Sequence, residues 1–202
     1  TMPTRISPAN STRLVGLFAF KNKEERAVAF ILGQIVLAFI YSLFLEWALH
    51  KYLLHNLGKK RGSPFSFHFF EHHGQCRRNN FVDSAYDTFN IKLDRGSGKE
   101  LFSLGVLLLL HLPLLFIVPW ASAILLLCVV HYFVIHVLSH RHPQWAREWL
   151  PWHYAHHMAP NQEANWGVRF DWIDRLLGTR EYYVGTAREE KDIARRAKRK
   201  PH

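Results

Sequence analysis

The sequence predicts an all-α fold, in which an integral-membrane bundle of helices is capped by a cytosolic, histidine-rich helical domain. Two observations support this fold class. Apolar residues make up 49% of the chain, as in many soluble proteins, but they are segregated into runs long enough to cross a bilayer. Ten of the 14 histidines fall into four groups near the ends of these runs. Since 202 residues suffice for one domain of ordinary size, residues 1–202 are expected to form a single membrane domain.

The first firm span is expected at Ala27–Phe44, a run of eighteen mainly apolar residues. A single helix from Ala27 to His55 would be about 42 Å long, against ~30 Å for the hydrocarbon core, so its last turns should project into water. Residues 1–26 are expected to form an N-terminal interfacial segment, because its apolar run Leu14–Phe20 is too short to cross a bilayer.

Two further runs, Leu101–Val118 and Ala121–Leu138, are separated only by Pro119-Trp120 and predict a tight hairpin of two spans. Lys and Arg are absent between Leu101 and His140, but nine lie in residues 51–99 and twelve in residues 141–200. The positive-inside rule therefore puts both flanking regions, with all four histidine groups, in the cytoplasm. The expected location is the endoplasmic reticulum or a bacterial inner membrane.

The N-terminal topology stays open at this point. Three spans would put the N-terminus outside, although residues 1–26 contain five basic residues. A re-entrant Leu14–Phe20, forming a short extra segment, would remove the conflict.

Other stretches carry weaker signals. Gly96-Ser97-Gly98 predicts a turn, and the basic tail 187–202 predicts either a surface helix or a solvated tail. The cysteines Cys76 and Cys128, one in a basic loop and one in an apolar run, are expected to be free thiols. Within the second run, His111 is expected to be a neutral histidine facing a neighbouring helix.

The grouped histidines have the spacing of metal ligands. They are His50/His55, His68/His72/His73, His136/His140 and His153/His156/His157. Residues four apart on an α-helix share a face, whereas residues five apart are separated by about 140°, so His50 and His55 could serve one metal only if the helix ends between them. Ten imidazoles suit two metals, and iron, zinc and copper are all compatible with such ligands.

Carboxylates are available to orient these imidazoles. The candidates are Glu46, Glu71, Asp83, Asp171 and Asp174, with a surface salt bridge as the competing interpretation for each. A metal pair held below apolar helices is suited to attack on an inert lipid chain. Cleavage of an unactivated C–H bond needs oxidative chemistry that acid–base side chains lack, which favours iron.

Taken together, the motifs resemble the fatty acid hydroxylase superfamily, an integral-membrane group that includes sterol desaturases and fatty acid 2-hydroxylases. The resemblance runs from about Glu46 to Thr179. It rests on the four histidine motifs and on Asn165-Trp166-Gly167-Val168 followed by Asp171-Trp172-Ile173-Asp174-Arg175-Leu176-Leu177-Gly178-Thr179. It adds Asn165 to the residues that could orient the ligands.

The resemblance implies a membrane-bound di-iron monooxygenase that hydroxylates a lipid-like substrate with O2 and two electrons from an external donor. It also implies a division of the ligands between the metals. One metal would take His55, His68, His72, His136 and His153, and the other would take His50, His73, His140, His156 and His157. His131, five residues before His136, and His142 are rival ligands.

The chain departs from the family pattern in two ways. It has no cytochrome domain, so the donor is expected to be a separate b-type cytochrome or a ferredoxin with its reductase, and only one clear span precedes the hairpin where two are usual. A desaturase on the same site is the close alternative. A haem-binding membrane electron carrier and a metal-storage or transport protein are the alternatives from other classes. The net charge of +10 fits contact with anionic lipid and comes without a nucleic-acid recognition motif.

Overall fold

The structure is a computed structural model that describes residues 22–87, 92–93 and 96–198. The run Leu14–Phe20 and the last residues of the basic tail lie outside the described residues. The described part contains helices and no strand. In chain order the helices are α2 (Lys23–Ala48), η1 (Leu49–Leu57), η2 (His68–His72), α3 (His73–Arg78), η3 (Ser84–Tyr86), α4 (Gly96–His111), η4 (Leu112–Phe116), α5 (Pro119–Arg141), α6 (Pro143–Trp149), α7 (Pro151–Met158), α8 (Trp172–Leu176) and α9 (Ala187–Ala197).

Three helices are long and apolar enough to cross a membrane, as the sequence predicts. They are α2 continued through η1 to Leu57, α4 continued through η4 to Phe116, and α5. Large apolar side chains on their outer faces are exposed, including Phe30, Leu110 and Phe116. An exposed apolar surface of this extent is characteristic of a lipid-facing one.

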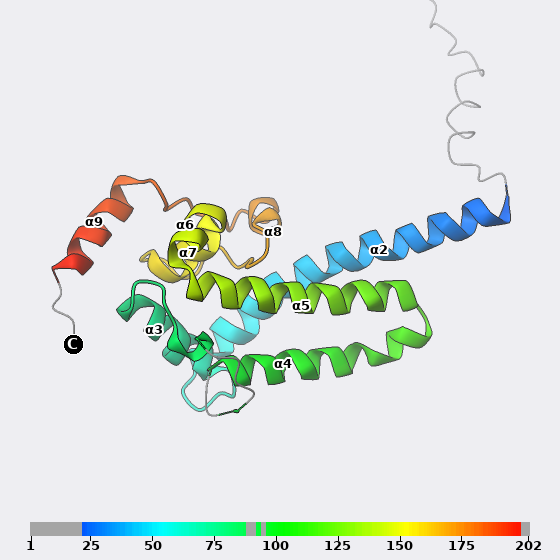
Figure 1. Cartoon of the computed structure of the whole chain (residues 1–202), viewed down its shortest axis with the longest axis horizontal. Helices are drawn as coiled ribbons and strands as arrows, with labels where there is room; N and C mark the ends of the chain where they lie inside the picture. Colours follow the sequence, from blue (N-terminus) through cyan, green and yellow to red (C-terminus); the bar gives the residue numbers. More distant parts are fainter. Residues whose placement is uncertain (1–21, 88–91, 94–95, 199–202) are drawn as a thin grey trace, which may run out of the picture.

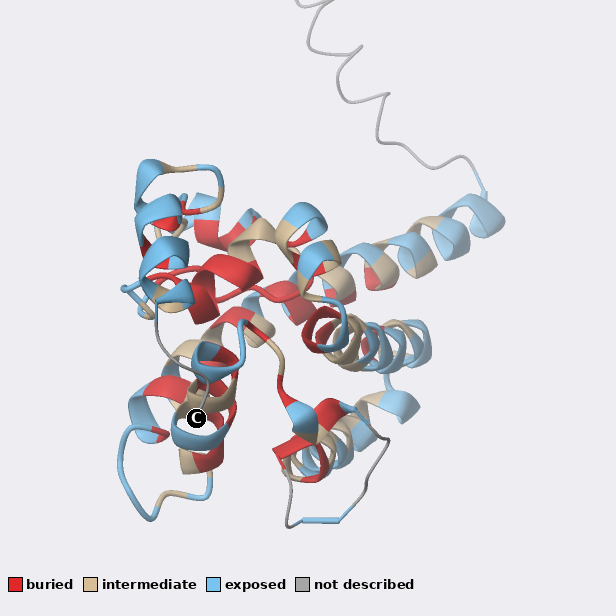
Figure 2. Ribbon diagram, turned by 60° about the vertical axis from the view of Figure 1, so that its left-hand side comes forward, coloured by how far each residue is buried: buried red, intermediate tan, exposed pale blue. Residues whose placement is uncertain are grey.

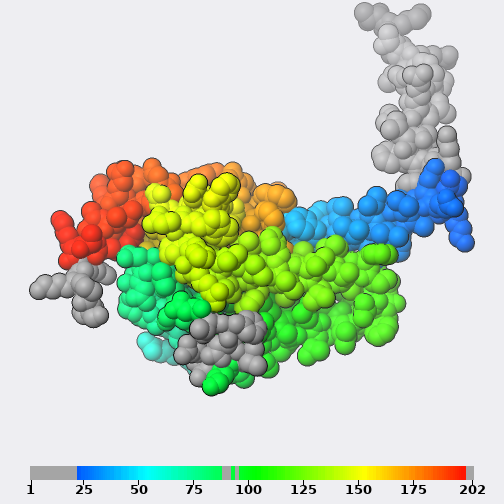
Figure 3. Space-filling model, in the orientation of Figure 1, coloured from blue at the N-terminus to red at the C-terminus, as the bar shows by residue number. Residues whose placement is uncertain are grey.

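The hairpin of α4 and α5 lies beside α2, which packs mainly against α5 (Figure 1). At the closed end of the hairpin, Gln34 of α2 accepts a hydrogen bond from the Ala121 backbone N–H at 3.3 Å, which satisfies one of the free donors in the first turn of α5. The N-terminal turns of α2 project beyond the hairpin (Figure 3).

The shorter helices α3 and α6–α9 gather at the other end of the hairpin, where α2 ends, α4 begins and α5 ends (Figure 1). Buried residues are concentrated at this end, whereas the long helices are mostly exposed (Figure 2). We call this end the cap. Its apolar core contains Phe81, Tyr154 and Met158, and a second small core joins Trp47 of α2 to Trp166.

Several local expectations are confirmed and one is wrong. Both cysteines are free and buried, and α9 forms a surface helix. The turn expected at Gly96-Ser97-Gly98 is instead the first turn of α4. All three residues are buried, and the Ser97 hydroxyl donates to the Ala85 carbonyl at 2.6 Å. The small side chains at these three positions allow the first turn of α4 to pack closely against η3.

Candidate metal centre

All ten grouped histidines lie in the cap and are buried, with at most 4% of any side chain exposed. Burial of a polar ring is unfavourable unless its nitrogens find partners. The two rival ligands are placed elsewhere: His131 and His142 are both exposed. The ten buried imidazoles form two adjoining groups.

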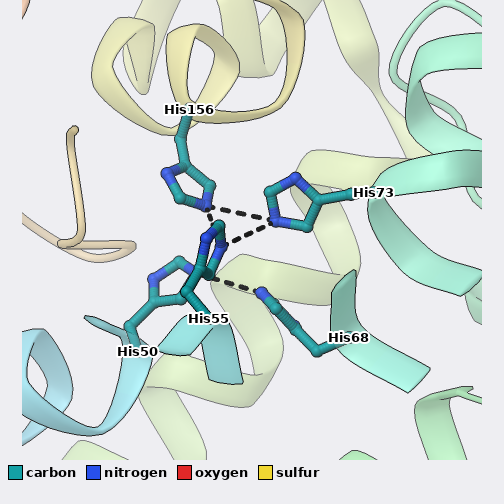
Figure 4. Close-up of side chains that lie close together, drawn as sticks. All are labelled: His50, His55, His68, His73 and His156. Carbon is teal, nitrogen blue, oxygen red and sulfur yellow. Dashed lines mark hydrogen bonds between the residues drawn. The ribbon is translucent and has the colours of Figure 1, made fainter. Parts of the chain in front are cut away.

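The first group consists of His50, His55, His68, His73 and His156, which offer ligand nitrogens that all lie within 4.8 Å of one another. Their Nε2 atoms converge (Figure 4). The Nε2 of His55 is 3.1 Å from that of His73, and His156 Nε2 is 3.1 Å from His55 Nε2 and 3.2 Å from His73 Nε2. Two nitrogens bound to one ion at about 2.1 Å lie about 3.0–3.4 Å apart. The spacing therefore fits a shared metal ion.

The first group depends on two π-helical segments. Leu49–Leu57 and His68–His72 are both π-helices, with roughly 4.4 residues per turn instead of 3.6, so residues five apart return to nearly the same face. As a result His50 and His55 face one point. The expectation that they could not do so without a helix break is wrong, because it assumed α-helical geometry.

The second group consists of His72, His136, His140, His153 and His157. The nitrogens of His136, His140, His153 and His157 all lie within 4.8 Å of one another, and so do ligand atoms of His72, Cys76, His140 and His157. Here the pairs spaced four apart lie on the α-helices α5 and α7, as expected. His140 Nε2 is 3.2 Å from His136 Nε2 and 3.3 Å from His153 Nε2.

The two groups are in contact, since the ring centroids of His73 and His157 are 4.3 Å apart. Their membership differs from the division implied by the family resemblance. The π-helix at His68–His72 places His68 with His73 in the first group and His72 in the second, while the rings of His68 and His72 stay neighbours, with centroids 5.2 Å apart. The structure thus brings the ten predicted ligands together but pairs them differently.

Hydrogen bonds at the Nδ1 atoms fix the protonation of several rings. Nδ1 of His50 donates to the Trp166 carbonyl at 2.6 Å, that of His156 to Ala164 at 2.8 Å and that of His140 to Phe81 at 3.0 Å. A carbonyl can only accept, so in each neutral ring Nε2 carries a lone pair, and these lone pairs point into the groups.

Two carboxylates hold rings of the second group. His72 Nδ1 donates to Asp83 at 2.7 Å, as expected for one of the predicted carboxylates. His136 Nδ1 lies 2.7 Å from Glu100, which also accepts a hydrogen bond from Tyr86 at 2.6 Å. Sequence reasoning missed Glu100. The available signal was a carboxylate immediately before an apolar run, where its burial is unfavourable without a partner.

Several buried ring nitrogens in the described part of the chain lack a hydrogen-bond partner, as expected for atoms that would bind a metal ion. The Nε2 of His72 and both ring nitrogens of His157 are buried without a hydrogen-bond partner among the described residues. Burial lowers the pKa of His72, His73, His153 and His157 well below the ordinary value of 6.5, so these rings are neutral and able to bind a cation. A buried set of nitrogen donors of this kind suits iron, zinc or copper.

The other predicted carboxylates and Asn165 lie one layer further out. Glu71 is exposed and pairs with Lys99, whereas Asp171 pairs with Arg175 and Arg180. Glu46 pairs with the buried Arg169 and accepts hydrogen bonds from the backbone N–H groups of Val168 and Arg169. Glu46 and Asp171 therefore stabilise the segment that follows α7, Glu71 does not contact it, and none of the three holds a ring directly.

The segment 164–167 links these outer residues to the candidate ligands. It presents the Ala164 and Trp166 carbonyls to His156 and His50. The Asp174 carboxylate stabilises this segment by accepting hydrogen bonds from the backbone N–H groups of Trp166 and Gly167, at 2.9 and 2.8 Å. Asn165 adopts a left-handed conformation, with φ of 60°, which Asn tolerates better than most residues. Asn165 and Asp174 therefore influence the rings of His50 and His156 through the Trp166 and Ala164 carbonyls.

An apolar cavity of about 570 Å³ leads to the first group. It lies between α2, α4 and α5, and His50, His68 and Glu100 line its inner end. Its volume is typical of small-molecule sites, about 300–1,000 Å³. The cavity connects the interior of the membrane-spanning bundle with the candidate metal centre.

Comparison with known proteins gives no assignment. The chain matches no protein-family model, no curated protein and no solved structure.

Proposed function

We propose that this chain is a membrane-bound di-iron monooxygenase of the fatty acid hydroxylase superfamily, which hydroxylates an unactivated C–H bond of a lipid-like substrate. The observation that carries the proposal is the convergence of ten buried imidazoles, in two adjoining groups, at the end of an apolar cavity between membrane-spanning helices. A hydrolase acting on a polar substrate would not need that combination.

The cap is proposed to face the cytoplasm. The distribution of Lys and Arg supports this orientation, because the flanks of the hairpin are basic and its closed end has no Lys or Arg. A separate b-type cytochrome or a ferredoxin with its reductase would then reach the cap from the cytoplasm and supply electrons.

Two metal ions would be held by the first and second histidine groups. Bound iron would supply the activation of O2 that side chains lack. The balanced reaction consumes one substrate C–H bond, one O2, two electrons and two protons, and yields one C–OH group and one water. The ten imidazoles would hold the metals in a buried site, and Asp83, Glu100 and the backbone carbonyls would fix the rings.

The cavity would position the substrate. Its lining is mainly leucine, valine and phenylalanine, which exclude water and accept a hydrocarbon chain without leaving polar groups unpaired. His50 and His68 at its inner end would then lie beside the carbon that reacts. This arrangement supports a lipid chain entering from the bilayer.

Two alternatives make different predictions. A desaturase on the same site would remove two hydrogens and release both oxygen atoms as water. A haem-binding electron carrier predicts two histidines facing each other across a flat slot. The histidines described here pack with ring centroids 4.3 Å apart at the contact of the groups, which does not favour haem.

Turnover with isotope-labelled O2 tests the proposal. The iron-loaded protein in lipid nanodiscs, supplied with a reductant and membrane lipids, should yield a lipid carrying one labelled oxygen, and His156→Ala should yield none. A product lacking two hydrogens and without label would favour the desaturase. Absence of any O2-dependent product from a fully iron-loaded sample, across sterol, acyl and carotenoid lipids, would contradict the proposal.

A further inference from the structure

A polar bridge crosses the bundle far from the metal centre. The Tyr41 hydroxyl on α2 and His111 Nε2 on α4 are 3.0 Å apart. His111 Nδ1 donates to the Leu107 carbonyl at 2.8 Å, so Nε2 of the neutral ring accepts the hydrogen bond from Tyr41. The expectation that His111 faces a neighbouring helix is confirmed. We call this pair the Tyr41–His111 bridge.

The bridge lies at the outer limit of the apolar cavity. On α2 the lining begins at Ser42, directly after Tyr41, and on α4 it ends at His111 itself. On α5 it begins at Leu125, which is buried. The lining of all three helices therefore starts or stops in the neighbourhood of the bridge.

The position of the bridge fixes the depth of the cavity. Glu100 at the inner end and His111 at the outer end are eleven residues apart on one helix, or about 16 Å at ~1.5 Å per residue. Tyr41 and His50 are nine residues apart on the first span, or about 13 Å at ~1.5 Å per residue, so a hydrocarbon chain with its reacting carbon beside His50 could extend about 13–16 Å before it meets the bridge.

The bridge is better suited to close the cavity than to bind a polar group of the substrate. The two ring nitrogens of His111 are both used, one by Tyr41 and one by Leu107. α2 and α4 each pack against α5, and the bridge adds a direct link between α2 and α4 across the cavity. A satisfied polar pair at this place acts as a wall, because breaking it inside a bilayer is unfavourable.

We propose that the Tyr41–His111 bridge is the specificity-determining end wall of the cavity and limits the length of the substrate's hydrocarbon chain. The inference rests on the proposed function for the identity of the occupant, a single unbranched apolar chain. Beyond the proposed function, the inference names a pair of residues, Tyr41 and His111, that would decide which hydrocarbon chain lengths fit the cavity.

Binding of a homologous series of saturated fatty acids to the full chain in nanodiscs tests the inference, with displacement of a fluorescent polyene fatty acid as the readout. For the wild-type protein, affinity should rise about fourfold per added methylene, from ~0.8 kcal/mol each, and then stop rising at a limiting length. In His111→Ala the rise should continue beyond this limit, with a gain of at least about fourfold for the first longer chain.

Two further variants keep the test informative if His111→Ala does not fold. Leu104→Trp adds bulk to the lining nearer the metal centre and should shorten the limiting length. Leu109→Ala, on the exposed face of α4 outside the cavity, should leave the limit unchanged. A limiting length in folded His111→Ala equal to that of the wild-type protein would overturn the inference, as would an unchanged limit in Leu104→Trp or affinity that does not depend on chain length.

The binding readout requires neither metal nor turnover. A clear length limit in a protein that fails to oxidise lipids would leave the end wall standing and contradict the monooxygenase. Lipid oxidation without a length limit would support the monooxygenase and contradict the end wall.

Discussion

Each imidazole of the candidate metal centre has a second ring nitrogen, and the residue that binds this second nitrogen decides how the first one points. Three of those partners are backbone carbonyls, contributed by Phe81, Ala164 and Trp166. Backbone partners leave no side-chain signature, so the sequence could not reveal them. It did reveal Asp83, because a carboxylate in a histidine-rich polar stretch is a recognisable candidate.

Replacement of Glu100 by Gln should weaken metal binding. The change keeps the shape of the side chain but removes the negative charge beside His136, 2.7 Å away. Loss of such a partner typically costs about 10–100-fold in metal affinity. Competition with a chelator measures this affinity. Glu71→Gln is the matched control, since Glu71 is exposed and pairs with Lys99, and it should bind metal like the wild-type protein. Equal affinities for the two variants would count against the role of Glu100.

A methyl group at position 167 should disrupt the segment that presents carbonyls to His50 and His156. A Cβ on Gly167 would lie 2.1 Å from the Phe170 carbonyl oxygen, so the backbone must shift. We expect Gly167→Ala to destabilise the protein by about 1–3 kcal/mol and to lower its metal content. Thermal unfolding in detergent measures the first effect. Gly105→Ala is the control, because a Cβ there meets nothing within 4 Å and alanine favours a helix. A Gly167→Ala protein as stable as Gly105→Ala would refute this expectation.

At the scale of elements, the sequence predicted which segments carry ligands but not how they turn. Apolar runs of about twenty residues predicted α2, α4 and α5 because a bilayer demands that length. The π-helices at Leu49–Leu57 and His68–His72 could not be predicted, because π-helices and α-helices are formed by the same kinds of residue and differ by less than one residue per turn. This difference decides which histidines meet.

An exchange of Leu54 and His55 tests the π-helical geometry without changing composition. In the π-helix, the double variant Leu54→His/His55→Leu would turn the imidazole away from His50, so the first group should lose its metal while the second retains its own. If η1 were α-helical, position 54 would share a face with His50 and the exchange would preserve or improve binding. Metal content per chain separates the two outcomes.

At the scale of the whole molecule, the buried cluster makes stability depend on pH. Burial lowers the pKa of His72, His73, His153, His156 and His157 well below 6.5, so the folded cap takes up few protons where the unfolded chain takes up many. Their contribution to stability is therefore present above pH 6.5 and is lost as the pH falls below it.

Thermal unfolding of the metal-free protein should show this dependence. The melting temperature should be nearly constant above about pH 7 and fall steadily below about pH 6.5, where the histidines of the unfolded chain become protonated. A variant with several of these histidines replaced by Gln should show a weaker dependence. A melting temperature that rises on acidification would contradict the burial of neutral imidazoles.

More of the overall architecture than of the candidate site could be predicted from the sequence. Segregated apolar runs and clustered histidines gave three spans and a polar cap, because bilayer thickness and metal coordination both impose simple spacings. The cavity could not be predicted, since it arises where α2 and α4 leave space along α5. The grouping of the ten histidines in the structure differs from the division that the resemblance implies, because two of the segments that carry them are π-helical.

Metal content of the purified protein, with its optical spectrum, tests the central claim most directly. The wild-type chain should hold about two non-haem metal ions, and His156→Ala and His157→Ala should each lose metal from one group. His131→Ala, which alters an exposed histidine outside both groups, should lose none. A haem absorption band, or metal content that is the same in all four proteins, would contradict the dinuclear centre and with it the proposed oxidation chemistry.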